Sequence, residues 1–247
     1  MPGIKRKALL MIIASLTVQH AFAAVALDRT RIIYDGSQKT ISLNITNQNK
    51  DLPFLAQSWI ENEQGEKIKG PLISLPPVQR IEPGAKSMVK LQSMPDVRTL
   101  PQDRESLYYF NLREIPPRSD KANVLQIALQ TRVKLFYRPD SIKPKQNIDD
   151  TFQKITLTRD GNFWQLNNDT PYYFTIVNVD SKKSETPNPK FTSQMVNPLT
   201  HSRINIDGPS LGTHPVLTYI NDFGARPMLT FSCAGNECHV IADNENK

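Results

Sequence analysis

The chain has 247 residues, of which 38% are hydrophobic and 22% are charged, and its formal net charge at pH 7 is +6. The first 23 residues contain three basic residues and no acidic one, so the remainder carries only +3. This small excess comes without a run of basic residues interleaved with aromatic ones, which argues against a nucleic-acid partner.

The N-terminus has the pattern of a secretory signal peptide. Basic residues at positions 5–7 precede an apolar run over residues 8–18, and an A-x-A sequence follows at residues 21–23. The apolar run is shorter than the roughly 20 residues that cross a bilayer, so we favour cleavage over a membrane anchor. We expect residues 1–23 to be removed and the exported chain to begin at Ala24.

The first half after this segment reads as a series of short strands. Apolar and polar residues alternate between turn signals, and no stretch keeps a helical period for three turns, which predicts an all-β fold. Trp59, in the third expected strand, is a candidate core aromatic of a sandwich. Proline pairs at 76–77 and 116–117 indicate loops or edges, because proline lacks the donor that a central strand needs. The expected strands are 25–34, 39–47, 52–61, near 72, 86–92, 106–113 and 124–137.

The second half repeats this organisation after a break. Prolines and charged residues interrupt the pattern at 139–145, which we interpret as a linker between one domain over 24–138 and another over 146–247. The polar stretch 181–190 is expected to be a long exposed loop. The strands expected here are 155–159, 163–167, 172–180, 201–206, 215–220, 227–233 and 239–242.

Only two cysteines are present, Cys233 and Cys238. In an exported chain this close spacing favours a disulfide that closes a tight hairpin. The alternative is a metal site made by these cysteines with His239, with or without His214. We prefer the disulfide, because the paired C-x₂-C spacing of metal sites is missing.

The sequence shows no constellation typical of an enzyme. His201, His214 and His239 have no matching nucleophile or metal motif, and no glycine-rich phosphate loop occurs. For the acidic residues Asp103, Glu105 and Glu114, ion pairing at the surface is the default interpretation. We therefore expect no enzymatic activity, no cofactor and no bound metal.

Residues 124–135 form an unusually long alternating segment. A strand with one face in a core would explain the pattern, but the length exceeds the usual five or six residues. Part of the segment is therefore a candidate exposed edge, which would present Leu125, Ile127 and Leu129 to another chain by β-augmentation.

Four sequence blocks carry a resemblance to a known family. They are AVALDRTR (24–31), LAQSWIE (55–61), FNLREIPP (110–117) and TYIND (218–222). Together they resemble the periplasmic pilus chaperones. The resemblance implies a periplasmic protein with two immunoglobulin-like β-sandwich domains, arranged as a boomerang with a cleft. Such a protein binds and caps pilus subunits, including adhesins, and delivers them to an outer-membrane usher.

The resemblance also implies roles for individual residues. Leu125, Ile127 and Leu129 would enter the open groove of a subunit, a mode called donor-strand complementation. Arg31 and Lys134 would anchor the C-terminal carboxylate of the subunit and thereby fix its register. Lys134 has the opposite strand parity to the three aliphatic residues, so a twist or a bulge is expected between them.

A further trio is implied to be structural. Glu105, Arg138 and Asp222 match residues that bridge the two domains in this family and set their angle. Arg138, at the domain junction, can pair with both carboxylates.

Other functions remain as alternatives. An adhesin or receptor module would place its ligand-binding residues in end loops, and Asn44 and Asn168 lie in sequons that would suit a glycosylated receptor. A secreted hydrolase lacks its nucleophile and base. The cognate subunits, the pilus type and any self-association of the free protein are left open.

Overall fold

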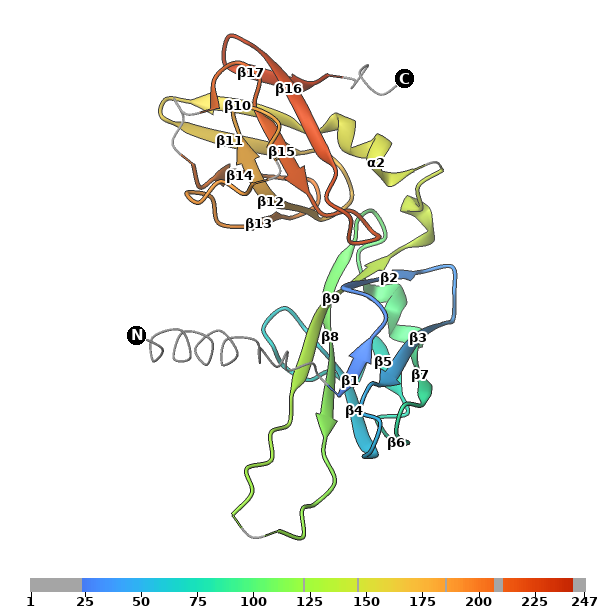
Figure 1. Cartoon of the computed structure of the whole chain (residues 1–247). Helices are drawn as coiled ribbons and strands as arrows, with labels where there is room; N and C mark the ends of the chain where they lie inside the picture. The colour runs from blue at the N-terminus through green and yellow to red at the C-terminus, as the bar shows by residue number, and fades with distance from the viewer. Residues whose placement is uncertain (1–23, 122, 146, 185, 207–210, 242–247) are drawn as a thin grey trace, which may run out of the picture.

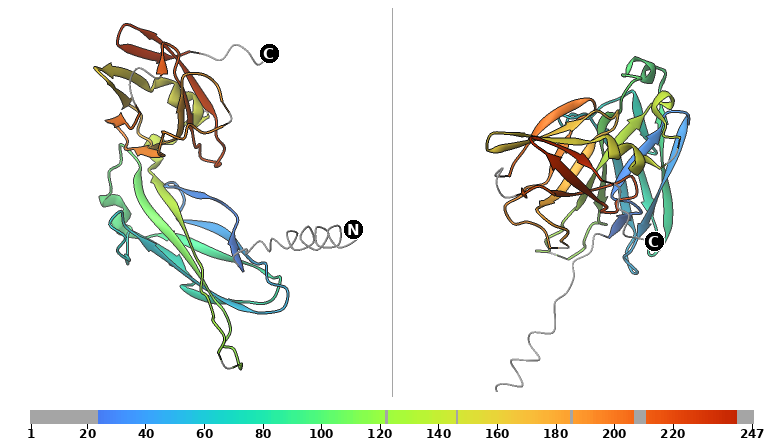
Figure 2. Two further views of the ribbon diagram at one scale, coloured as in Figure 1. Left: turned by 60° about the vertical axis from the view of Figure 1, so that its left-hand side comes forward. Right: turned by 90° about the horizontal axis from the view of Figure 1, so that it is seen from above.

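A computed structural model describes residues 24–121, 123–145, 147–184, 186–206 and 211–241. The predicted signal peptide lies outside these residues. The described chain forms two β-sandwich domains that are set at an angle to each other (Figures 1 and 2), as expected. No helix in the described part is long and apolar enough to cross a membrane.

The first domain packs two sheets face to face. One sheet has the order β1 (Val25–Leu27), β3 (Thr40–Asn47), β7 (Lys86–Ser93) and β5 (Leu72–Leu75). The other has the order β2 (Arg31–Asp35), β9 (Gln130–Arg138), β8 (Ser106–Ile115), β4 (Phe54–Glu61) and β6 (Val78–Ile81). Inward side chains of both sheets, such as Leu43 and Phe110, form one core.

The predicted first strand is in fact two strands on different sheets. β1 pairs antiparallel with β3, whereas β2 pairs parallel with β9. The chain crosses between the sheets at residues 28–30, where Asp28 accepts hydrogen bonds from the Arg29 and Asn44 side chains. Alternation alone did not reveal this crossing, since both pieces have strand-like sequences.

The second domain is built on one continuous ladder of strands. The order is β13 (Gln194–Val196), β12 (Phe174–Asp180), β15 (Val216–Tyr219), β16 (Met228–Ala234), β17 (Glu237–Val240), β10 (Thr156–Asp160), β11 (Phe163–Asn168) and β14 (Thr200–Ile204). Its end strands β13 and β14 contact each other, so the ladder folds over its own core. A short helix, α2 (Ile148–Thr151), starts at Asn147, whose side chain accepts from the Asp149 amide.

The prediction that Trp59 lies in the core is wrong. In β4 the even-numbered residues from Phe54 to Ile60 face inward, so Trp59 lies on the outer face. Its indole N–H donates to Glu61 at 2.7 Å, and Lys67 and Arg113 flank its ring.

The predicted disulfide is confirmed. Cys233 and Cys238 face each other across the β16–β17 hairpin and are bonded. The alternative metal site is therefore wrong, because both thiols that it needs are consumed. The described residues contain no group of three or more His, Cys, Asp or Glu residues able to hold a metal ion.

Candidate protein-binding site

A row of large apolar side chains is exposed next to the first domain. The segment between β8 and β9 extends away from the sandwich (Figure 1). Leu125 is 84% exposed, Ile127 61% and Leu129 42%. The predicted strand over 124–137 is thus shorter than expected, since β9 begins at Gln130 and the aliphatic residues precede it.

The proline pair explains why pairing stops there. The last β8–β9 pair is Arg113 with Gln130, and the Glu114 amide then donates to the Leu129 carbonyl at 3.0 Å. Pro116 and Pro117 follow on the β8 side, and proline has no N–H to continue the ladder. The backbone of residues 124–128 therefore lies outside the sheet, with its apolar row uncovered.

The exposed row has the same odd-numbered spacing as the inward residues of β9. Val133, Leu135 and Tyr137 belong to the core, and Leu129 shares their odd parity. A twist or a bulge was expected here, and the unbroken β8–β9 register from Gln130 to Tyr137 excludes a bulge within this paired segment. Lys134 lies on the face of β9 opposite to Val133 and Leu135, whereas the aliphatic residues precede the strand.

Arg31 and Lys134 are brought together by the parallel pairing of β2 with β9, where they are register partners. Arg31 donates from Nη1 to the Ile220 carbonyl of the second domain at 3.0 Å, and its guanidinium carbon is 5.8 Å from the Phe136 ring centroid. Its Nε is buried and has no hydrogen-bond partner among the residues that the structure describes. The structure thus places two cations of distant sequence origin side by side.

The pKa values of both cations are lowered, chiefly by burial. Desolvation lowers the pKa of Arg31, although the charges of Asp222 and Glu105 act in the opposite direction. Desolvation, assisted by the positive charge of Arg31, also lowers the pKa of Lys134. A negatively charged group bound here would relieve both effects.

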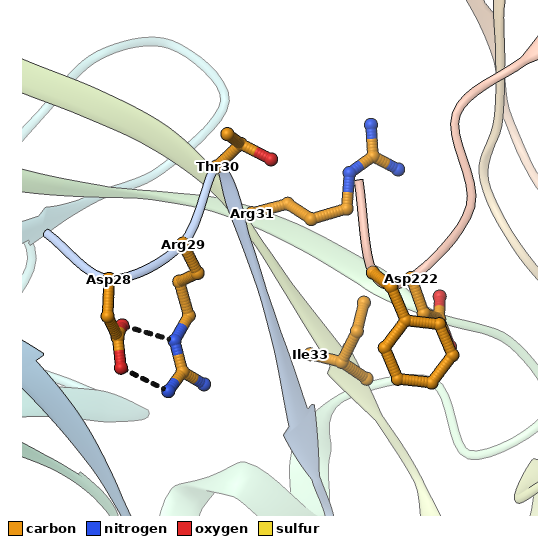
Figure 3. A pocket seen from close by; sticks show the side chains of 7 residues that line it. Asp28, Arg29, Thr30, Arg31, Ile33 and Asp222 are labelled. Atoms are coloured by element: carbon orange, nitrogen blue, oxygen red, sulfur yellow. Dashed lines mark hydrogen bonds and ion pairs between the residues drawn. The ribbon is translucent and has the colours of Figure 1, made fainter. Parts of the chain in front are cut away.

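A pocket of about 380 Å³ opens beside Arg31 between the two domains (Figure 3). The Asp28–Arg29 ion pair forms one wall, and Asp222 approaches from the second domain. Phe223, which is 87% exposed, belongs to the same lining. The complete lining is Asp28, Arg29, Thr30, Arg31, Ile33, Asp222 and Phe223.

The predicted trio joins the domains beneath this pocket. Arg138 donates from Nε and Nη2 to one Glu105 oxygen at 2.9 and 2.7 Å, and from Nη1 to Asp222 at 2.7 Å. The other Glu105 oxygen accepts from the Tyr173 amide, and the Glu105 amide donates to the Pro171 carbonyl. These contacts cross the junction and hold one domain against the other.

Burial and ion pairing act in opposite directions on the pKa values of Glu105 and Arg138. Desolvation raises the pKa of Glu105 to about 7, against the lowering effects of Arg138 and the Tyr173 amide. Desolvation alone would lower the pKa of Arg138, but its hydrogen bonds and ion pairs with Asp222 and Glu105 raise it. The pKa values of Glu105 and Arg138 are thus both raised, the first by burial and the second by its two carboxylate partners.

The default interpretation of the acidic residues holds for only one of them. Asp103 is exposed and paired with Arg104, whereas Glu105 and Glu114 are buried. Glu114 follows the core residues of β8 with the same parity, a signal present in the sequence. The three histidines, His201, His214 and His239, are exposed.

Comparisons with known proteins agree with this architecture. A family model described as "Pili and flagellar-assembly chaperone, PapD N-terminal domain" matches residues 24–143, and one described as "Pili assembly chaperone PapD, C-terminal domain" matches residues 150–231. The chain is 51% identical to the chaperone protein PapD of Escherichia coli over 239 residues, covering 96% of this chain and 98% of that protein.

Solved structures give the same result. The periplasmic chaperone SfaE is 30% identical, with a TM-score of 0.66 over 83% of this chain and 98% of that one. The SafB chaperone, solved in complex with the Salmonella enterica SafA pilin, shares the fold. It is 23% identical, with a TM-score of 0.70 over 87% of this chain and 99% of that one.

Proposed function

The chain belongs to the family of PapD-like pilus-assembly chaperones, and from this premise we propose that it caps pilus subunits through Leu125, Ile127 and Leu129 while Arg31 and Lys134 hold the subunit's C-terminal carboxylate. It is a periplasmic chaperone and not an enzyme. Its partners are pilins, adhesin subunits and an outer-membrane usher that receives them.

The exposed aliphatic row is the observation that carries the proposal. Three large apolar side chains are exposed on a backbone segment that pairs with no strand of the described chain, an arrangement that favours aggregation unless a partner covers it. A subunit whose sandwich lacks a strand would accept this segment as its missing strand. Burial of each leucine-sized side chain is worth roughly 1.5 to 3 kcal/mol, so the row can supply most of a stable complex.

The paired cations suit a carboxylate. Arg31 offers a planar fork and Lys134 a compact charge, and both have been desolvated without a carboxylate of their own within 4.0 Å among the described residues. A chain terminus held here would fix the register of a strand lying along the exposed segment. A slip by one residue would present Gln126, Ala128 and Gln130 to the groove.

The domain division and the bridging trio belong to the same proposal. We place the first domain at 24–138, the linker at 139–145 and the second domain at 146–247. The first core includes Tyr137 and the buried residues of the second begin at Ile148, with Ile142 of the linker packed against them, which supports this division. Glu105, Arg138 and Asp222 would then set the angle at which the two domains receive a subunit.

Co-purification from the periplasm tests the proposal. The chain is co-expressed with a candidate pilin as wild type, Arg31→Ala, Lys134→Ala and the exposed control Lys90→Ala. We expect a one-to-one complex for wild type and the control, and its loss for the two anchor variants while they stay folded by circular dichroism. Full binding by the anchor variants would show that the anchor assignment is wrong. Failure of wild type to bind any pilin would favour an adhesin or receptor module.

A further inference from the structure

A carboxylate occupies a core-facing position at the end of β8. Tyr108, Phe110 and Leu112 are even-numbered residues of β8 that pack in the first core, and Glu114 is the next residue in that row. Glu114 is only 6% exposed. Burying an ionised carboxylate costs several kcal/mol unless a cation or several hydrogen bonds compensate.

The described surroundings compensate this charge incompletely. One Glu114 oxygen accepts a hydrogen bond from the Val25 amide at 2.7 Å. Within the described residues, no Lys, Arg or His nitrogen lies within 4.0 Å of the Glu114 carboxylate. The charged side chains of neighbouring elements have partners of their own: Arg113 lies over Trp59, Arg132 pairs with Glu61, and Asp28 pairs with Arg29.

The residue before Val25 is held next to this carboxylate. The Ala24 carbonyl accepts from the Gln48 amide at 2.6 Å, and Val25 is buried opposite Asn47. Consecutive backbone nitrogens are at most about 3.6 Å apart, so the Ala24 nitrogen lies within about 6 Å of the Glu114 oxygen. This distance places the Ala24 nitrogen in the immediate surroundings of the Glu114 carboxylate.

We propose that Glu114 is the binding site for the α-ammonium group that cleavage after Ala23 leaves on Ala24. The inference rests on the predicted cleavage site, and the match of the family model from residue 24 supports that site. In the uncleaved chain the Ala24 nitrogen is an uncharged amide. Cleavage would therefore create a cation where a buried carboxylate lacks one.

The pair would also stabilise the base of the exposed segment. The Glu114 amide donates to the Leu129 carbonyl, while its side chain holds β1 through Val25. One residue thus joins the start of the exported chain to the point where the aliphatic row leaves the sheet. Removal of the signal peptide would complete the first domain at the place that receives the subunit.

The first experiment follows the α-amine itself. Protein purified from the periplasm is checked by mass spectrometry for Ala24 as its first residue, and the pKa of the α-amine is measured by NMR titration in wild type, Glu114→Gln and the exposed control Glu63→Gln. We expect a pKa at least one unit above the usual value of about 8 in wild type and the control, and the usual value in Glu114→Gln. A different first residue, or an unshifted α-amine in wild type, would overturn the proposal.

A second experiment leaves Glu114 in place and moves the ammonium group. Two glycines added before Ala24 displace it by about 7 Å. We expect the unfolding equilibrium constant at pH 7 to rise about tenfold, which corresponds to one pKa unit. The raised α-amine pKa also means that wild type loses this stability as the pH rises from 8 to 10, whereas the extended chain does not. Equal stability of the two chains at pH 7 would contradict the proposal.

Discussion

Truncation of the exposed row should weaken subunit binding in proportion to exposure. Replacing leucine or isoleucine by alanine removes three carbons, worth about 0.8 kcal/mol each when they are fully transferred from water. Scaled by the 84%, 61% and 42% exposure of Leu125, Ile127 and Leu129, the expected losses are about 2, 1.5 and 1 kcal/mol. These values correspond to roughly 30-fold, 12-fold and 5-fold weaker binding.

The folding stability of the free chaperone should change little, because these side chains are exposed to water before binding. The assay measures the dissociation constant of each variant with one purified subunit, and thermal unfolding monitors the free protein. Met88→Ala, which alters a half-exposed side chain on β7, is the control and should bind as wild type does. Equal affinity for all variants, or a reversed order of the three effects, would refute the reasoning that the row is buried by the subunit.

Three further changes probe the rest of the molecule. Arg138→Ala should lower the free energy of unfolding by about 3–5 kcal/mol in urea titrations, because it leaves Glu105 buried without its cation. A loss below 1 kcal/mol would show that the domain junction does not depend on this ion pair. Subunit affinity should fall at alkaline pH. The pKa of Lys134 is lowered in the free protein, and a bound carboxylate would raise it. Because the complex then holds the proton more tightly, deprotonation of Lys134 weakens binding. Lys134→Arg keeps its charge and should remove this dependence in binding measurements from pH 7 to 10; a persisting dependence would point to another group. Reduction of the disulfide, or the double change Cys233→Ser and Cys238→Ser, should lower the free energy of unfolding by about 2 kcal/mol, the value for so short a loop. Chemical denaturation measures this loss, and an unchanged free energy of unfolding would contradict the expected effect of loop closure.

Alternation in the sequence was sufficient for most strands but not for their assignment to sheets. The prediction over 39–47 corresponds to β3, and that over 86–92 to β7. The short strands β6 and β13 were missed, because four or three residues give too little alternation to recognise. Trp59 and Ile60 are neighbours in a strand, so only one of them can face the core. The aromatic residue type favoured Trp59, but Ile60 is the residue that faces inward.

The candidate site was predictable only in part from local pattern. Leu125, Ile127 and Leu129 were visible as an alternating row, and the prolines at 116–117 explain why the row lies beyond the sheet. Arg31 and Lys134 come from distant parts of the chain, and only a parallel strand pair, which leaves no local signature, brings them together. The resemblance to the chaperone family supplied what the local sequence could not.

The parallel pairing of β2 with β9 has a consequence for how subunits are chosen. With a carboxylate pinned at Lys134 as proposed, the distance to Leu129 is five residues of strand, or about 17 Å. That interval is set by covalent geometry and does not stretch. The fixed spacing between the carboxylate anchor and the aliphatic row would therefore select subunits by the length of their final strand. If the last strand of a pilin were longer or shorter by one residue, its groove would be out of register with Leu125, Ile127 and Leu129 once its carboxylate was bound.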